Sequence, residues 1–197
     1  MFSDDLPDLE TSKAYYEIEF DRYAVAMFHP VTTEAKEMEQ YARDFVNALE
    51  QDNHNYVMIY PNNDMGSQCI IEAYQRLKEN PRFRVFSSLR FEYFLTLLKN
   101  SKFIIGNSSA GIREAPYYGI PIINIGTRQQ NRTLNADIIN VGYDQDSIAK
   151  ALKNIDSSKV AKVNSDFGLG NSSLLFLETL SDDAIWQLNH QKQFRDI

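Results

Sequence analysis

The chain has 197 residues, of which 43% are apolar and 24% are charged, and its formal net charge is −7. This length predicts one domain with a sizeable core, and the composition excludes a disordered chain. The acidic balance disfavours binding to nucleic acid or to an anionic membrane surface, because both need an excess of lysine and arginine. One cysteine cannot form an internal disulfide, and with three dispersed histidines it predicts no zinc cluster.

The first ten residues lack the basic and apolar segments of a signal peptide. No apolar run approaches the roughly 18–20 residues of a membrane span. We therefore expect a cytoplasmic protein without a membrane partner. Residues 1–22 are acidic and rich in tyrosine and show no alternation of strands and helices, so we predict a lead-in linker there and the folded domain in residues 23–197.

Short apolar runs alternate with longer segments in which apolar residues recur every three or four positions. The runs predict strands and the periodic segments predict helices. In chain order the pattern predicts a strand at 23–28, a helix at about 35–49, a strand at 56–60, a helix at about 70–77, a strand at 83–86, a helix at 91–98, a strand at 102–106, a helix at 109–118, a strand at 121–125, a weaker strand at 137–141, a helix at 148–155, a loop at 156–168 and a helix from about 172.

The predicted strands are continuous apolar runs, which is typical of strands that are buried on both faces. Strands separated by helices indicate right-handed crossovers and a parallel sheet. The sequence therefore predicts the α/β class, as a doubly wound, Rossmann-like parallel sheet.

Ligands of such sheets bind outside the carboxyl ends of the strands. Polar loops follow five predicted strands, and we expect them to converge on one edge of the sheet; they are His29–Thr33, Pro61–Ser67, Ser87–Leu89, Gly106–Gly111 and Gly126–Arg132. Within the second loop, Asp64 is expected to cap the helix that follows.

The loop Gly106-Asn-Ser-Ser-Ala-Gly111 joins a buried strand to the start of a helix. Its small residues let a ligand approach the backbone, and free N–H groups at a helix start favour an anion. The hydroxyl groups of Ser108 and Ser109 add donors, so a phosphate site is one interpretation. The loop matches neither the dinucleotide nor the P-loop fingerprint, and a helix cap with small packing residues is an equally good interpretation.

Five further side chains near these loops each have a functional and a structural interpretation. Glu114, about one turn into the same helix, could accept ribose hydroxyls or simply favour the helix dipole. Arg128 and Arg132 could hold phosphate charge or lie solvated in their loop. His29 could be an acid, a base or a phosphate donor, or a structural histidine. Phe94 could stack on a base, although its helical spacing favours the core.

Taken together, these segments resemble a known family. They are His29-Pro-Val-Thr-Thr33, Tyr60-Pro-Asn-Asn-Asp64, Gly106-Asn-Ser-Ser-Ala-Gly-Ile-Arg-Glu114, Gly126-Thr-Arg-Gln-Gln-Asn-Arg132 and the late Phe167-Gly-Leu-Gly-Asn-Ser172. They resemble the carboxyl-terminal half of hydrolysing UDP-N-acetylglucosamine 2-epimerases, the sialic-acid pathway enzymes that release N-acetylmannosamine and UDP. The resemblance covers about residues 23–180, with the first four segments as spaced motifs in order and the late segment after them.

The resemblance implies one half of a two-domain GT-B fold, with this half binding UDP or a UDP-N-acetylhexosamine. Ser88, Leu89 and Phe94 would line the uracil pocket and Glu114 would hold the ribose. The residues implied on the phosphate and sugar side are Ser108, Ser109, Ala110 and Gly111 around the pyrophosphate, Arg128 and its support Arg132, His29 as the catalytic residue facing the phosphates or the sugar, and Asn62 and Asp64 along the same edge.

In the family, removal of the sugar C2 proton and anti-elimination of UDP give a glycal, to which water adds; no metal or redox cofactor is needed. Family members are about twice as long, and most of their proton-handling carboxylates lie in an amino-terminal domain. That domain is thus an expected partner, residues 1–22 resemble the connection to it, and a homodimer is possible. This chain alone is expected to bind UDP weakly without turnover.

Two other functions stay open: a non-catalytic module that binds UDP-sugars, and the donor domain of a GT-B glycosyltransferase. The second is weakened by His29-Pro-Val-Thr-Thr33, which resembles the epimerases. The sugar is also open between UDP-N-acetylglucosamine and a UDP-linked 2,4-diacetamido-trideoxyhexose.

Overall fold

The computed structural model describes residues 5–133, 135–155 and 166–188. The described chain forms two compact units, one before Phe167 and one from Phe167 onward. The elements of the first unit are α1 Leu9–Tyr15, β1 Ala24–Met27, the 3-10 turn η1 Thr32–Glu34, α2 Met38–Gln51, β2 Tyr56–Ile59, α3 Ser67–Gln75, β3 Phe83–Phe86, α4 Phe91–Lys99, β4 Ile104–Gly106, α5 Ala110–Tyr117, β5 Ile122–Ile125, β6 Ile138–Val141 and α6 Gln145–Ile155.

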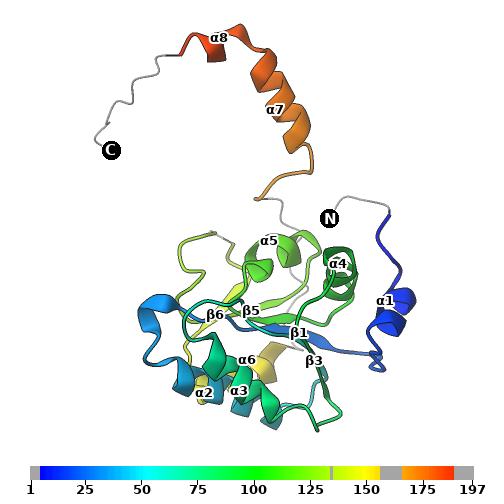
Figure 1. Ribbon diagram of the computed structural model, residues 1–197, viewed down its shortest axis with the longest axis vertical. Coiled ribbons are helices and arrows are strands. Elements are labelled where there is room, and N and C mark those ends of the chain that lie inside the picture. Colours follow the sequence, from blue (N-terminus) through cyan, green and yellow to red (C-terminus); the bar gives the residue numbers. More distant parts are fainter. Residues whose placement is uncertain (1–4, 134, 156–165, 189–197) are drawn as a thin grey trace. The chain divides into compact units, whose positions relative to one another are not determined.

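The six strands form one sheet in the order β3-β2-β1-β4-β5-β6, and every neighbouring pair is parallel (Figure 1). This order confirms the doubly wound, Rossmann-like α/β fold. The direction of winding reverses between β1 and β4, and in such sheets the crevice beyond the carboxyl ends at this reversal is the usual ligand site. The topology therefore directs attention to the loops after β1 and β4.

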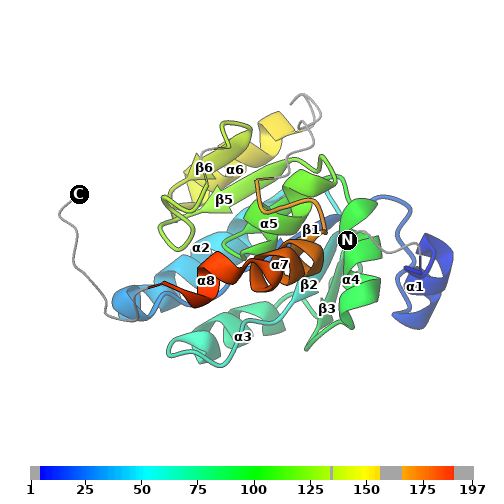
Figure 2. The same cartoon turned by 90° about the horizontal axis from the view of Figure 1, so that it is seen from above.

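Both faces of the sheet are covered, with α2, α3 and α6 on one face and α1, α4 and α5 on the other (Figures 1 and 2). In β1, Ala24 and Ala26 belong to the first core and Val25 to the second. Alternate side chains of a strand point to opposite faces, so burial of both faces requires apolar residues at every position. This is why the strands could be recognised as continuous apolar runs.

The first 22 residues contain a helix that the sequence pattern did not predict. Asp8 caps α1 by accepting a hydrogen bond from the Thr11 N–H at 2.7 Å. The helix packs against α4, where the Thr96 hydroxyl donates to the Pro7 carbonyl at 2.7 Å, and Ile18 is only 4% exposed. The helix is thus an addition to the expected linker, and the role of the segment as a connection stays a prediction.

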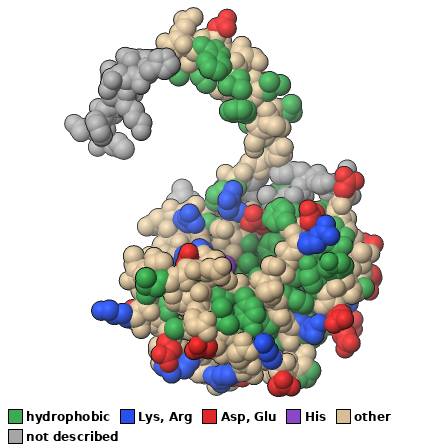
Figure 3. Space-filling model, in the orientation of Figure 1, with side chains coloured by type: hydrophobic (Ala, Val, Ile, Leu, Met, Phe, Trp, Pro, Cys, Tyr) green, Lys and Arg blue, Asp and Glu red, His purple; other side chains and the backbone are tan. Residues whose placement is uncertain are grey.

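The second unit contains α7 Ser172–Ser181 and α8 Asp183–Trp186. A helix from about residue 172 is therefore confirmed, and most of the predicted loop at 156–168 lies outside the described residues. Large apolar side chains of this unit are exposed (Figure 3), including Leu174, Leu175, Phe176, Leu177 and Trp186. No helix in the described ranges is both long and apolar enough to cross a membrane.

Gly106, the last residue of β4, brings the ends of β4 and β1 into close contact. Its φ is +132°, and a Cβ atom there would overlap the carbonyl oxygen of Met27. The next residue, Asn107, donates its N–H to the same carbonyl at 3.0 Å. Only glycine adopts this backbone conformation without strain, so Gly106 fixes where the loop after β4 begins.

We expect Gly106→Ala to lower the free energy of unfolding by about 2 kcal/mol or more, because it adds both a steric overlap and backbone strain. Gly111→Ala is the matched control, since its Cβ would lie 3.4 Å from Ile122 Cγ2 in an ordinary contact. The control should change stability by less than about 1 kcal/mol. Urea denaturation followed by circular dichroism measures both; equal losses would contradict the steric argument.

Candidate functional site

Asn107 joins the two loops that flank the reversal of the sheet. Its side-chain oxygen accepts the His29 backbone N–H at 2.7 Å, and its side-chain nitrogen donates to the His29 carbonyl at 2.8 Å. Asn107 is completely buried, although 78 positions separate the two residues. A buried amide with both groups paired fixes its partner firmly, so His29 is held at the carboxyl ends of β1 and β4.

The backbone carbonyl of Asn107 gathers the loop after β5. It accepts hydrogen bonds from Arg128 Nη1 at 3.2 Å and from Gln129 Nε2 at 2.8 Å, and Arg132 Nη1 donates to Gln129 Oε1 at 3.0 Å. Gln129 is only 3% exposed. The structure thus brings together His29, Arg128 and Arg132 from two loops that are about 100 positions apart in the sequence.

Arg128 is a partly buried cation that lies close to a second cation, Arg132. Neither it nor Arg132 forms an ion pair with an acidic side chain in the described part of the chain. Partial burial lowers the pKa of Arg128, the charge of Arg132 lowers it further, and the nearby Asp64 acts in the opposite direction. An arginine nevertheless stays protonated in proteins, so this partly desolvated cation is suited to an anionic ligand.

His29 is a neutral hydrogen-bond donor in this environment. Burial, and then the charge of Arg128, lower the pKa of His29 from 6.5 to about 4. Its Nδ1 atom accepts the Asn62 N–H at 3.2 Å, so the proton of the neutral ring is on Nε2. The side chain therefore offers an N–H group and no positive charge at neutral pH.

The loop between β4 and α5 offers backbone amides and hydroxyl groups on the same edge. The N–H groups of Ser108 and Ser109 have no hydrogen bond within the described chain, and the Ala110 N–H donates to Ser108 Oγ at 3.3 Å. The Gly111 N–H already donates to the Ser108 carbonyl at 3.1 Å, so Gly111 offers little besides its small size. Free amides at the start of a helix are suited to an anion.

Glu114 lies on α5, about one turn beyond these amides. It is half-buried, and burial raises the pKa of its carboxyl group while the charge of Arg113 opposes the rise. Its own backbone N–H and the charge of Arg113 both favour the ionised form, and no hydrogen bond from its side chain to another residue occurs among the described residues. A partly desolvated carboxylate of this kind is suited to accept hydroxyl groups from a ligand.

A cavity of about 400 Å³ opens beside His29, between the loops after β2 and β3 and the helix α4. Its walls include Ser88, Leu89 and Phe94, the three residues expected at a uracil pocket, together with Asn62. Phe94 is 8% exposed and also belongs to the core, so its two interpretations are compatible.

Asp64 lies on the same edge but does not cap α3. Its carboxylate accepts a hydrogen bond from the Asn62 side chain, and only its backbone carbonyl contacts the start of the helix, where it accepts the Ser67 N–H at 3.0 Å. The residue before the helix is Gly66, with φ +94°. The predicted cap is therefore wrong, because a left-handed glycine takes the capping position.

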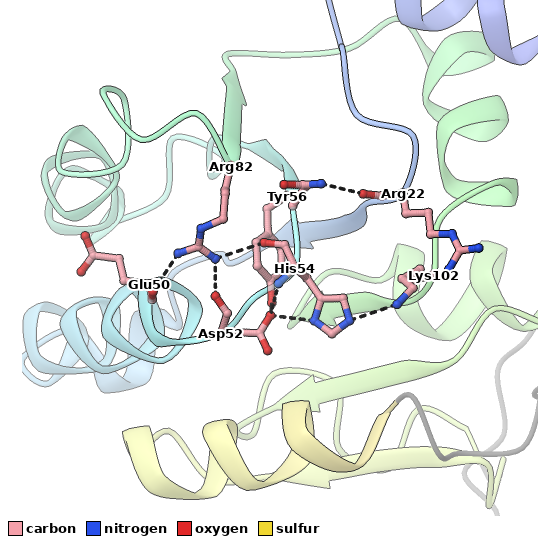
Figure 4. A network of polar contacts seen from close by, with 8 residues as sticks. Arg22, Glu50, Asp52, His54, Tyr56, Arg82 and Lys102 are labelled. Carbon is pink, nitrogen blue, oxygen red and sulfur yellow. Dashed lines mark hydrogen bonds and ion pairs between the residues drawn. The ribbon is translucent and has the colours of Figure 1, made fainter.

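His54 lies in a different network, at the amino ends of the strands (Figure 4). Its Nδ1 atom is 2.7 Å from the Asp52 carboxylate, and the Tyr56 hydroxyl donates to the same carboxylate at 2.7 Å. Arg82 donates to the backbone carbonyls of Glu50, Asp52 and His54. This network ties the start of β2 to the end of α2 and to β3, so it is structural. His190 lies outside the described residues.

Sequence comparison adds an independent finding. The family described as UDP-N-acetylglucosamine 2-epimerase matches residues 3–181. The chain belongs to this family. The matched range includes the motifs after β1, β2, β4 and β5 that contribute residues to the edge of the sheet described above.

Curated relatives of the chain are longer proteins. A UDP-N-acetylglucosamine 2-epimerase of Neisseria meningitidis is 43% identical over the whole of this chain and 53% of its own length. A UDP-N,N'-diacetylbacillosamine 2-epimerase (hydrolyzing) of Legionella pneumophila is 28% identical over 77% of this chain and 40% of its own length. The chain therefore spans about half the length of these epimerases, or less.

Solved structures agree on the fold. The UDP-N-acetylglucosamine 2-epimerase of Neisseria meningitidis bound to UDP-GlcNAc has a TM-score of 0.69 and 15% identity, over 87% of this chain and 48% of that one. The Methanocaldococcus jannaschii enzyme in complex with UDP-GlcNAc and UDP has a TM-score of 0.69 and 19% identity over the same shares. The match to one half of these chains supports the GT-B half-fold predicted from the sequence.

The environment of His29 predicts how its ring titrates. The unfolded chain binds a proton as the pH falls through about 6.5, but the folded chain resists until about pH 4. The neutral ring therefore contributes stability that is complete above pH 6.5 and is lost as the pH falls toward 4. We expect an NMR titration to give a His29 midpoint near pH 4. A midpoint at or above 6.5 would contradict the buried, neutral ring.

Proposed function

We propose that this chain is the UDP-binding half of a hydrolysing UDP-N-acetylglucosamine 2-epimerase. The observation that carries the proposal is the group of donors at the reversal of the sheet. The partly buried Arg128 and the neutral His29 are both fixed on Asn107, beside the free amides of Ser108 and Ser109. Such a set of donors suits a diphosphate.

The proposal gives each part of the nucleotide its own contacts. Ser108, Ser109 and the adjacent backbone of Ala110 and Gly111 bind the pyrophosphate, and Arg128, with Arg132 behind it, supplies the positive charge. Glu114 accepts the ribose hydroxyls. Uracil occupies the cavity beside Ser88, Leu89 and Phe94; this cavity is open on the same edge as the phosphate donors.

The proposed reaction needs a base that removes the C2 proton and groups that stabilise the departing UDP. A base removes the C2 proton of the sugar while the bond from C1 to the UDP oxygen breaks, which gives a glycal; water then adds its oxygen to C1, and C2 takes a proton with inverted configuration. This half stabilises the departing UDP, through Arg128 and through a hydrogen bond from His29 Nε2. The carboxylates that move the C2 proton belong to the other half.

The relatives support the hydrolysing reaction and leave two sugars possible. The Legionella relative is named as hydrolysing, and another relative is an Escherichia coli polysialic acid biosynthesis protein, 29% identical over 80% of this chain. UDP-N-acetylglucosamine is the substrate we propose, and a UDP-diacetamido-trideoxyhexose is the alternative. A homodimer and a cytoplasmic location stay predictions.

Calorimetric titration of UDP into the chain tests the nucleotide site. We expect Arg128→Ala and Ser109→Ala each to weaken UDP binding by about 1–3 kcal/mol, because each removes a donor to a charged oxygen. Arg76→Ala is the matched control: Arg76 pairs with Glu50 at 2.7 Å in a surface ion pair between α3 and α2. The control should bind UDP like the wild type. No UDP binding by the wild type at millimolar concentration would refute the proposal.

Reconstitution tests the reaction. We expect the chain alone to release no N-acetylmannosamine from UDP-N-acetylglucosamine, because water is not excluded and the acid–base set is incomplete. Adding a separately produced amino-terminal half of the Neisseria relative should yield both N-acetylmannosamine and UDP. If UDP still binds and no product forms in the mixture, the chain is a non-catalytic UDP-sugar-binding module instead.

A further inference from the structure

The loop Ser87–Leu89 is a weakly held part of the proposed uridine site. It connects the end of β3 to the start of α4 and lines the cavity with three consecutive residues. Ser87 and Ser88 are exposed, and none of the three has a hydrogen bond of its own within the described chain. Leu89 packs on the core from one side. The position of the loop therefore depends mainly on its two ends, Phe86 and Arg90.

Tyr16 contacts both ends of this loop. Its hydroxyl oxygen accepts the backbone N–H of Arg90 at 2.9 Å. Its ring meets the Phe86 ring edge-on, with centroids 5.3 Å apart and an interplanar angle of 71°. Its own carbonyl accepts a hydrogen bond from Arg84 Nη2 at 3.2 Å, which ties the end of α1 to β3. One side chain from the first 22 residues thus bridges the strand and the helix that enclose the loop.

The hydrogen bond from Arg90 gives a partner to the backbone N–H at the start of α4. Arg90 is the capping residue of α4, and no side chain caps this helix from within. The first N–H groups of a helix lack partners in their own helix, and here a residue 74 positions away supplies one. Phe91 and Phe94 lie in the first part of this helix and line the cavity, so the same bond anchors the helix that forms this wall.

We infer that Tyr16 is a positioning residue for the base-binding loop. It controls affinity for the uridine part of the nucleotide and leaves affinity for the diphosphate unchanged, because the phosphate donors lie on β1, β4 and β5 loops that Tyr16 does not touch. The inference rests on the proposed function. It also gives the connecting segment before β1 an indirect part in ligand binding, through the bond from Tyr16 to Arg90.

The test compares UDP with inorganic pyrophosphate in calorimetric titrations of the 197-residue chain. Tyr16→Phe keeps the ring and removes the oxygen, so we expect UDP to bind about three- to tenfold more weakly, the loss of one hydrogen bond. Pyrophosphate binding should stay within about twofold, whereas a general loss of structure would weaken both ligands. Hydrogen exchange should become faster at residues 87–90 and stay unchanged at 106–111.

Tyr15→Phe is the matched control. Tyr15 is adjacent and 57% exposed, and its ring contacts Tyr93 at 4.8 Å between centroids without touching the loop. The Tyr15→Phe variant should bind UDP and pyrophosphate with wild-type affinity. If the Tyr16→Phe variant binds UDP with wild-type affinity, the inferred role of Tyr16 is overturned and the proposed function is not. The same holds if the variant loses affinity for UDP and for pyrophosphate equally. Failure of the wild type to bind UDP would overturn the proposed function, and this inference with it.

Discussion

The whole site depends on the reciprocal pair of hydrogen bonds between Asn107 and His29. They cross the point where the sheet reverses its winding, and they form because Gly106 has no side chain to separate β4 from β1. Asn107 also holds Arg128 and Gln129, because its backbone carbonyl accepts a hydrogen bond from each of their side chains. One buried amide therefore sets the distance between three loops that are remote in sequence, which no local interaction could do.

The charges at the site explain why His29 and Arg128 need to be held in place by hydrogen bonds. Partial burial of the Arg128 guanidinium costs free energy, whereas burial of the His29 ring keeps it neutral. Hydrogen bonds to Asn107 and Asn62 hold these two groups in place, and under the proposed function an anionic ligand would offset the cost at Arg128. Burial of the Glu114 side chain raises its pKa. The edge of the sheet therefore combines a cation, a neutral hydrogen-bond donor and a partly desolvated carboxyl group.

The sequence predicted the sheet and the loops well, because burial on both faces leaves continuous apolar runs and parallel strands send their polar loops to one edge. It failed at α1, a helix of 7 residues that depends on contacts with α4. It also failed at Asp64, since Gly66 takes the cap position through its φ of +94°. Asn107 was visible only as part of a motif, because its partner lies 78 positions away.

The two ends of a bound nucleotide would be governed by different parts of the chain. Asn107 fixes the phosphate side from inside the sheet, through the loops after β1, β4 and β5. Tyr16 fixes the base side from outside, through the ends of β3 and α4. Tyr16 follows the last residue of α1, so the segment that precedes the first strand is linked to the ends of β3 and α4. Under the proposed function, this link would act on the base side of the nucleotide, and the Asn107 bonds would act on the phosphate side.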